Sequence, residues 1–184
     1  MKILSIDWDY ITGSCDIGKT CCGYCKERRI YQDFKRGDEF KLMPDWRNRF
    51  REIIKIKLKK KTPIYVAESH ANIMNHMGEN PLVLDFDFHY DNYSKKMLKC
   101  ENWIYYTELR GGIVIRHPRD TPGINSVFIC KSSPWTPESM DRYFYEMIKL
   151  LSINAGVEPK FIGHMGETLR KEYRHYKERI LLNI

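Results

Sequence analysis

Short apolar runs that alternate with helix-forming segments constrain the fold of this chain most strongly. Residues 2–6, 63–67, 81–84 and 126–130 are rich in Ile, Val and Leu, and residues 112–116 form a plausible fifth run. Strands that are buried on both faces of a parallel sheet have this continuous apolar character. The alternation therefore predicts an α/β fold, a three-layer sandwich with a mostly parallel sheet.

The segments between these runs carry helix signals. Residues 45–60 place apolar side chains near helical spacing, and Thr136 with Pro137 matches the N-cap and first position of another helix. Residues 167–182 read as a closing helix, whereas residues 13–40 are rich in Cys, Gly, Asp and Lys and predict an irregular excursion.

Length and charge narrow the class of protein. The chain has 184 residues, 42% of them hydrophobic, so we expect one domain over residues 1–184. Lys and Arg total 31 against 24 for Asp and Glu, which gives a formal charge of +7. That excess would suit an acidic partner, but the lysines of residues 55–61 sit at the end of the predicted helix over residues 45–60. The basic residues of 170–179 are interleaved with acids, so both clusters favour solvated helix faces over a nucleic-acid site.

No apolar run approaches the roughly 18 residues of a membrane helix, and Asp7 comes too early for a signal peptide. We therefore expect a cytoplasmic protein without a membrane partner. The cysteines of the segment over residues 13–40 fit reduced loop thiols best, with a structural zinc site or a redox pair as weaker alternatives. They are Cys15, Cys21, Cys22 and Cys25.

Acidic and histidine residues follow three of the apolar runs at a spacing of two. They are Asp7 and Asp9 after the first run, Glu68 and His70 after the second, and Asp85, Asp87, His89 and Asp91 after the third. Sites of open parallel sheets form beyond the carboxyl ends of the strands, so we expect these side chains to converge. The strand period of two predicts that the members of each set share one face, with Phe86, Phe88 and Tyr90 on the other.

Like charges this close together at the end of a buried strand repel each other and lose solvation unless a cation neutralises them. Four aspartates and two imidazoles exceed the needs of one tetrahedral zinc, whereas two ions that share a carboxylate would use them all. Such ligands suit Mn(II), with Fe(II), Co(II) and Zn(II) as competitors. The predicted ligands are Asp7, Asp9, His70, Asp87, His89 and Asp91, and the deeper Asp85 is expected to support them.

These residues carry a resemblance to a known family. The segment Asp87-Phe88-His89-Tyr90-Asp91 resembles the Asp-x-His-x-Asp metal motif of arginases and agmatinases, and Ser5-Ile6-Asp7-Trp8-Asp9 resembles their Ser-Phe-Asp-x-Asp motif, in reversed chain order. The chain resembles a small, permuted branch of that superfamily, the peptide arginases. Further segments share this likeness: Glu68-Ser69-His70, Glu101-Asn102-Trp103 and Ser133-Pro134-Trp135-Thr136-Pro137.

The resemblance implies an arginase/deacetylase-like fold and a hydrolase that converts arginine in a ribosomally made precursor peptide to ornithine, with release of urea. It further implies two Mn(II) ions. Asp7, Asp87 and Asp91 with a histidine would hold one ion, and Asp7, Asp9, Asp87 and His89 the other. His70 is the candidate for the remaining ligand, although ordinary arginases have Gly-Gly-Asp-His there. The Asp-Pro that usually follows the Asp-x-Asp motif is missing.

Two residues are expected to act on the substrate and the attacking water. The resemblance assigns to Asp91 the orientation and deprotonation of the water. Glu68 lies two residues before His70, and its strand is expected to neighbour that of Asp7, so it is the candidate partner of the guanidinium. Support of His70 is an equal alternative for Glu68. Asn102 and Trp103 are candidates for the mouth of the site, with a position in the core as at least an equal alternative for Trp103. Ser132 and Ser133 are candidates for peptide contacts, with a purely structural turn before Pro134 as the alternative for Ser133.

Two other classes of function remain open. A related metal-dependent amide hydrolase or deacetylase would use a similar ligand set, and a basic binding module would use the metal only for its structure. The number of ions per chain and the released product, urea or acetate, distinguish the three.

Overall fold

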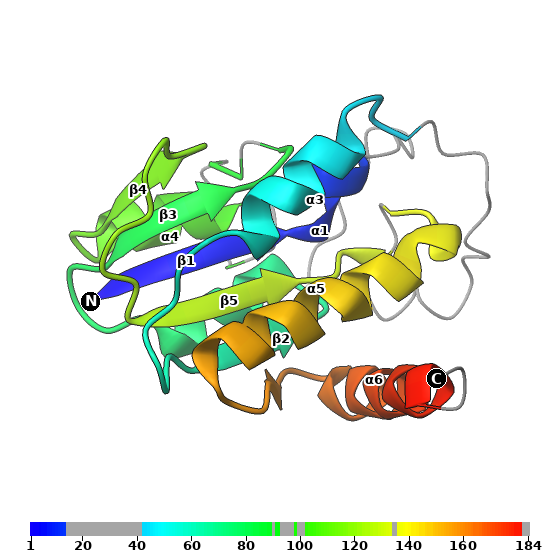
Figure 1. Cartoon of the computed structure of the whole chain (residues 1–184). Coiled ribbons are helices and arrows are strands. Elements are labelled where there is room, and N and C mark those ends of the chain that lie inside the picture. The colour runs from blue at the N-terminus through cyan, green and yellow to red at the C-terminus, as the bar shows by residue number, and fades with distance from the viewer. Residues whose placement is uncertain (14–41, 90, 93–97, 99–101, 134–135, 182–184) are drawn as a thin grey trace.

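A parallel β-sheet organises the computed structural model, which describes residues 1–184 except 14–41, 90, 93–97, 99–101, 134–135 and 182–184. The strands are β1 (Lys2–Asp7), β2 (Ile64–Ala67), β3 (Leu82–Phe86), β4 (Ile113–Arg116), β5 (Ser126–Cys130) and β6 (Lys160–Phe161). They form one six-stranded sheet in the order β4-β3-β1-β5-β2-β6, and every adjacent pair is parallel (Figure 1). The first strand of the chain thus lies inside the sheet.

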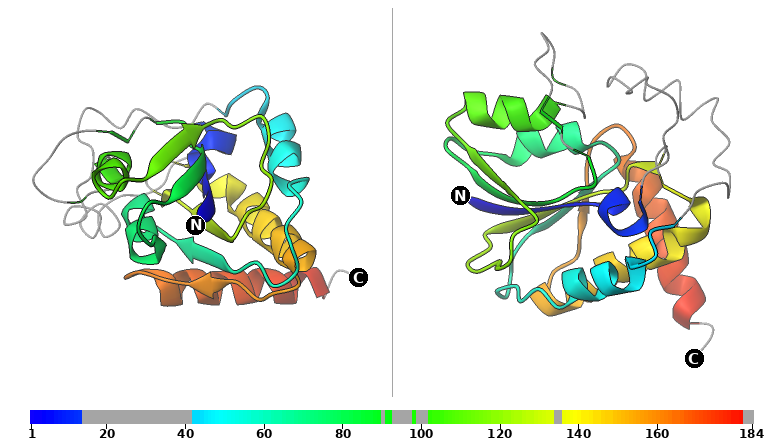
Figure 2. Two further views of the ribbon diagram at one scale, coloured as in Figure 1. Left: turned by 90° about the vertical axis from the view of Figure 1, so that its left-hand side faces the viewer. Right: turned by 90° about the horizontal axis from the view of Figure 1, so that it is seen from above.

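Helices cover both faces of the sheet (Figure 2). One face carries α3 (Trp46–Ile54), α5 (Asp141–Ala155) and α6 (Gly166–Leu181), and the other carries the 3-10 helix η1 (His70–His76) and α4 (Trp103–Leu109). The short helix α1 (Trp8–Thr12) continues from β1, and the 3-10 helix η4 (Glu138–Met140) precedes α5. The predicted three-layer α/β sandwich with a parallel sheet is therefore confirmed.

The side-chain alternation of β1 divides the core into two clusters. Leu4 and Ile6 pack in the larger cluster beneath α3, α5 and α6, whereas Ile3 packs in the smaller one beneath η1 and α4. Ser5 and Asp7 have the same parity as Ile3, so they face the smaller cluster. Polar side chains of β1 thus lie on the side of η1 and α4, at the carboxyl end of the sheet.

All five apolar runs predicted as strands are strands. The pattern did not indicate β6, because its two residues pair with β2 at the margin of the sheet and neither is fully buried. A two-residue strand leaves no measurable period in the sequence.

Two helix boundaries differ from the prediction. The segment over residues 45–60 is helical only to Ile54, after which Ile56 and Leu58 are buried and the lysines next to them in the sequence are exposed. Lys55 is the C-cap of α3, but the other lysines of residues 55–61 follow the helix, because the two-residue alternation suits an extended segment. Thr136 is no N-cap: its hydroxyl donates to the carbonyls of Lys131 and Ser132, and α5 begins after the 3-10 turn η4.

The predicted closing helix is α6, within one residue at each end of the range 167–182. The irregular excursion predicted over residues 13–40 and its four cysteines lie, apart from Gly13, outside the described residues. No helix in the described part of the chain has the length and apolar character that a membrane span requires.

Candidate metal centre

The predicted ligands gather beyond the carboxyl ends of β1 and β3. These two strands are neighbours, with Ser5 opposite Asp85 and Ile6 opposite Phe86 in the register. The chain leaves both strands at this edge, so Asp7, Asp9 and Asp87 arrive from adjacent backbones. His70 reaches them from the first residue of η1.

Asp7, His70 and Asp87 form one compact group of possible metal ligands, and all three are buried. Nδ1 of His70 lies 3.1 Å from Oδ2 of Asp7 and 3.2 Å from Oδ2 of Asp87. Asp7 is further fixed by Ser132, whose hydroxyl donates to Oδ2 at 2.8 Å. The group combines two carboxylates with one imidazole nitrogen.

Asp9, Asp87 and His89 form a second group, which shares Asp87 with the first. Nδ1 of His89 lies 2.7 Å from Oδ2 of Asp9, and the backbone N–H of Phe88 donates to Oδ1 of Asp9 at 3.2 Å. His89 is 45% exposed, whereas Asp9 is buried. The side of the site that carries His89 is therefore the side open to solvent.

Asp91 belongs to neither group but lies beside the first. Its Oδ2 is 3.9 Å from Nδ1 of His70 and accepts a hydrogen bond from the indole N–H of Trp103 at 3.1 Å. Trp103 is fully buried beneath the site, so it does not line a mouth. The structure thus brings all six predicted ligands into one cluster, with Asp91 at its margin.

The imidazole of His70 is held on three sides. The ring of Trp103 stacks on the imidazole with 4.4 Å between the ring centroids, and the ring of Phe128 from β5 stacks on it with 5.7 Å between the centroids. Oγ of Ser5 lies 2.6 Å from Nε2. When Nε2 donates to Ser5, the lone pair of Nδ1 points to Asp7 and Asp87, which is the tautomer that a metal ligand requires.

The predicted ligands come together through a turn and a helix start, and not through the side-chain alternation of continued strands. β3 ends at Phe86, and the N–H of His89 folds back to Oδ1 of Asp87 at 2.7 Å, so Asp87 and His89 meet through a turn. Asp7 ends β1 and accepts the N–H of Asp9 as the N-cap of α1, so Asp9 lies on a helix. The expectation of strand continuation was wrong, because an aspartate at a strand end readily closes such turns.

The aromatic residues between the ligands also differ from the expectation of one shared face. Phe86 is buried in the larger core cluster, but Phe88 is 45% exposed because the strand has already ended. Tyr90 lies outside the described residues. Arg116 of β4 holds the turn from outside, since its guanidinium donates to the carbonyl oxygens of Asp87 and His89.

Burial and mutual repulsion perturb the acids of the cluster. Burial and the charges of Asp7 and Asp87 raise the pKa of Asp9 to about 8. Burial and the charge of Asp87 raise the pKa values of Asp85 and Asp91 well above their usual range. Burial also opposes ionisation of Asp7, but the contact with His70 outweighs it and lowers the pKa of Asp7.

The two imidazoles respond in the opposite sense. Burial alone would lower the pKa of His70, but its contacts with Asp7 and Asp87 raise that pKa well above the usual value. In the same way, Asp9 outweighs burial and raises the pKa of His89 to about 9. The cluster therefore holds excess negative charge that protons compensate at neutral pH, and a cation can replace those protons.

Two buried atoms test whether a metal ion suits this site. Nδ1 of His70 and Oδ2 of Asp87 have no hydrogen-bond partner of acceptable geometry, although they lie 3.2 Å apart. Unsatisfied buried polar atoms are costly, so their presence at one point requires an explanation. Oxygen and imidazole nitrogen atoms are the donors that Mn(II) and similar divalent ions accept, so the residues fit such an ion.

The prediction that Glu68 and His70 share one strand face, on a strand next to that of Asp7, was wrong. β2 ends at Ala67 and lies between β5 and β6, so it does not neighbour β1, and His70 already belongs to η1. Glu68 is buried, and its Oε1 accepts the backbone N–H of Ser133 at 2.6 Å. Its role as guanidinium partner remains a prediction.

Other residues of the site were missed or assigned differently. The hydroxyl of Ser132 donates to Asp7, and the backbone N–H of Ser133 donates to Glu68. These two serines, which were expected to contact a peptide, therefore hold carboxylates of the site in place. Ser5 and Phe128, which surround His70, were not singled out as partners of that ring. A polar Ser5 within an otherwise apolar strand was the one available signal, but strand adjacency is needed to read it.

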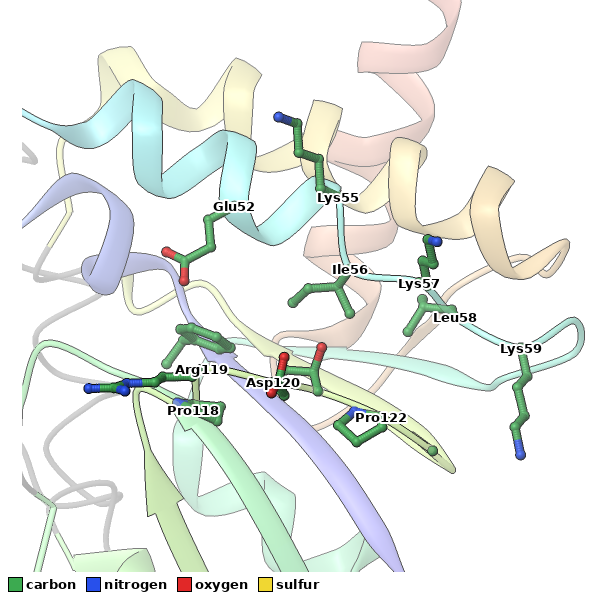
Figure 3. A pocket seen from close by; sticks show the side chains of 13 residues that line it. Glu52, Lys55, Ile56, Lys57, Leu58, Lys59, Pro118, Arg119, Asp120 and Pro122 are labelled. Atoms are coloured by element: carbon green, nitrogen blue, oxygen red, sulfur yellow. The ribbon is translucent and has the colours of Figure 1, made fainter.

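A separate pocket of about 750 Å³ lies on the opposite face of the sheet (Figure 3). Its walls are the segment after α3 and the loop between β4 and β5, with Ile56, Leu58, Pro118 and Pro122 among the lining side chains. None of the clustered carboxylates or imidazoles lines it. Among the described residues, the groups of side chains that could bind a metal ion therefore lie at the carboxyl edge of the sheet and not in this pocket.

A comparison with family models, curated proteins and solved structures found no match to this chain. The geometry of the cluster is accordingly the basis for any statement about function.

Proposed function

We propose that this protein is a metal-dependent hydrolase that converts arginine side chains of a peptide to ornithine with release of urea. The substrate would be a ribosomally made precursor peptide, and the site would hold two Mn(II) ions or other divalent ions. The proposal includes an arginase/deacetylase-like relationship of the fold.

The single observation that carries the proposal is the pair of ligand groups that share Asp87. Asp7 with His70 and Asp9 with His89 lie on either side of this carboxylate. A shared carboxylate between two sets of oxygen and nitrogen donors is the arrangement that two-metal hydrolases use. When bound, the ions would lower the pKa of a water from about 15.7 to near 7 and supply a nucleophile at neutral pH.

Asp91 is the candidate for the proton-transfer step. It lies at the margin of the cluster, and the Trp103 indole fixes one of its oxygens at 3.1 Å. Burial and the charge of Asp87 raise the pKa of Asp91 in the metal-free protein. Beside bound cations its carboxylate would be ionised and could accept a proton from the attacking water. Trp103 positions this carboxylate and stacks on His70 at the same time.

Glu68 remains the candidate partner of the substrate guanidinium. It is buried, and one of its oxygens accepts the backbone N–H of Ser133. A carboxylate can pair with a planar guanidinium through two hydrogen bonds. Glu68→Gln keeps the shape and removes the charge, so turnover should fall while both ions stay bound. Loss of an ion would instead make Glu68 a support of the metal ligands.

Incubation of the manganese-loaded protein with an arginine-containing peptide tests the proposal directly. Mass spectrometry should find the loss of one CN₂H₂ unit per arginine, and urea should be released in equal amount. Elemental analysis of the same preparation should find close to two ions per chain. One ion that Asp9→Ala leaves in place, or no loss of CN₂H₂, would refute the dinuclear guanidine hydrolase.

An acetyl-lysine peptide in a parallel reaction separates the alternative classes. Release of acetate would favour the amide hydrolase or deacetylase. Tight polyanion binding without turnover of either peptide would favour the basic binding module.

A further inference from the structure

The turn that joins Asp87 to His89 is held from two sides. On one side, the backbone N–H of Phe88 donates to Oδ1 of Asp9 at 3.2 Å. On the other side, Nη2 of Arg116 donates to the carbonyl oxygen of Asp87 at 2.9 Å and to that of His89. Asp87 and His89, together with Asp9, form the second ligand group. Arg116 therefore contacts the backbone of two of its three members.

The strand β4 brings Arg116 to the face of the sheet that carries the metal centre. β4 lies next to β3 at one end of the sheet, with Arg116 opposite Asp85 in the register (Figure 1). Val114 has the same parity as Arg116 and packs against the smaller core cluster, beneath η1 and α4. The side chain of Arg116 is 24% exposed and extends from this face to the turn after β3.

A positive side chain at this point is unfavourable for a site that binds cations, unless the side chain has another role. A guanidinium stays protonated at any physiological pH, and like charges repel. Nε of Arg116 lies 3.9 Å from Oδ2 of Asp85, so a neighbouring acid balances part of the charge. The hydrogen bonds to two carbonyl oxygens fix the path of the backbone, and a planar group with several donors suits that role.

The first ligand group is held by other contacts. Oγ of Ser5 lies 2.6 Å from Nε2 of His70, and the hydroxyl of Ser132 donates to Asp7 at 2.8 Å. Neither contact depends on the turn after β3. His89 is 45% exposed, so the turn carries a larger part of its placement. The two ligand groups therefore differ in what positions them.

We propose that Arg116 is a positioning residue for the second metal ion, because it holds the turn so that Asp87 and His89 face Asp9 before the ion binds. This inference rests on the proposed function, and specifically on its two-ion site. Without Arg116, the ion would have to order the turn when it binds, which costs affinity. Removal of a group that orients metal ligands typically lowers metal affinity by about 10- to 100-fold.

The variant Arg116→Met tests this role, because charge and positioning predict opposite changes. Loss of a positive charge by itself favours the binding of both cations. Loss of the support should instead weaken the second ion by about 10- to 100-fold and leave the first ion as tight as before or tighter. Competition between the full-length chain and a chelating dye for Mn(II) measures the affinities, and elemental analysis after removal of unbound metal measures the number of ions.

Two further variants complete the comparison. Arg119→Met is the matched control, because Arg119 is exposed, follows β4 and lines the separate pocket. It should not weaken the second ion. Arg116→Lys keeps the charge and hydrogen-bond donors on a shorter side chain, so it should recover part of the affinity that Arg116→Met loses. Electrostatics alone gives the opposite order, with the lysine variant weaker than the methionine variant.

Hydrogen exchange in the metal-free protein supplies a readout that involves no ion. The N–H groups of Phe88 and His89 are both bonded at the turn, to Asp9 and Asp87 respectively. If Arg116 holds the turn, both amides should exchange several-fold faster in Arg116→Met than in the native chain. The control variant should show the native rates.

The outcomes separate this inference from the proposed function. Weaker binding of the second ion with faster exchange at the turn supports the role of Arg116, whether or not the native protein releases urea from a peptide. Unchanged or tighter binding of the second ion, equal weakening of both ions, or native exchange rates overturns the inference, even if the native protein is a hydrolase. If Arg116→Met does not fold, Arg116→Lys decides, since it should weaken the second ion alone. A native chain that binds one ion overturns the inference together with the dinuclear centre.

Discussion

Replacement of Asp87 by asparagine is the sharpest test of the metal centre. Asp87 is the one residue common to both ligand groups. Asparagine has nearly the same shape, and its side-chain oxygen can still accept the N–H of His89, which lies 2.7 Å from Oδ1 in the native side chain. The substitution therefore removes a charge and leaves the turn intact.

The expected loss of affinity follows from that charge. Ligand atoms within each group lie within 4.8 Å of one another, so Asp87 is close to any ion bound among them. At about 4 Å and an effective dielectric constant of about 20, one pair of unit charges contributes about 4 kcal/mol. About 1.4 kcal/mol is a factor of ten, so metal binding should weaken by about a thousandfold or more.

The stability of the metal-free protein should change much less. Asp87 repels Asp9, Asp85 and Asp91, but it attracts the imidazoles of His70 and His89. These contributions have opposite signs, so we expect a change below about 1 kcal/mol, or about 2–4 °C in Tm for a chain of this size. A large change in affinity with a small change in Tm identifies a ligand rather than a folding defect.

Competition with a chelating dye measures the affinity, and thermal unfolding with and without manganese measures the stability. Asp120→Asn is the matched control, because Asp120 is exposed and lines the separate pocket. Asp120→Asn should behave like the unmodified protein in both assays. If Asp87→Asn binds two ions with unchanged affinity, the site has been assigned to the wrong residues.

Three further predictions follow from the same contacts. Ser5→Ala removes the partner 2.6 Å from Nε2 of His70, so metal affinity should fall by about 10- to 100-fold in the dye competition, and unchanged affinity would rule out this support. Lys131→Met removes a buried ammonium that lies 2.9–3.0 Å from two partly exposed carboxylates. It should cost about 2 kcal/mol in urea unfolding, less than the 3–5 kcal/mol typical of fully buried pairs; a loss near zero would contradict the pairing. Without metal, Asp9 with a pKa of about 8 and His89 with a pKa of about 9 bind protons more tightly in the folded protein than in the unfolded chain. Stability should therefore fall as the pH rises from about 4 to about 9, and the gain in Tm on adding manganese should be larger at pH 9 than at pH 6; an equal gain would count against the site.

The sequence indicated the layered α/β fold and the edge of the sheet at which the acidic and histidine side chains cluster. Strands buried between two helix layers need continuous apolar residues, and this requirement is visible in the runs that became β1, β2, β3 and β5. Acidic residues directly after such runs stand out, because a charged side chain next to a buried strand is costly unless it has a partner. Residue types and chain positions therefore sufficed to select six acidic and histidine residues that the structure brings into one cluster.

Tertiary structure decided how those ligands meet. Strand order places β5 between β1 and β2, so the reasoning that put Glu68 beside Asp7 by strand adjacency failed. The turn at Asp87 and the N-cap at Asp7 replaced the expected strand continuation, because side-chain hydrogen bonds to nearby backbone compete with the ladder once pairing ends.

The surroundings of His70 show the same division between sequence and structure. The sequence singled it out as a candidate ligand, since an imidazole two residues after an acid at a strand end suits that role. The partners that hold its ring come from β1, β5 and α4, as Ser5, Phe128 and Trp103. Contacts between segments so distant in sequence depend on the order and register of the strands, which arise from packing of the whole chain and are not encoded in any local period.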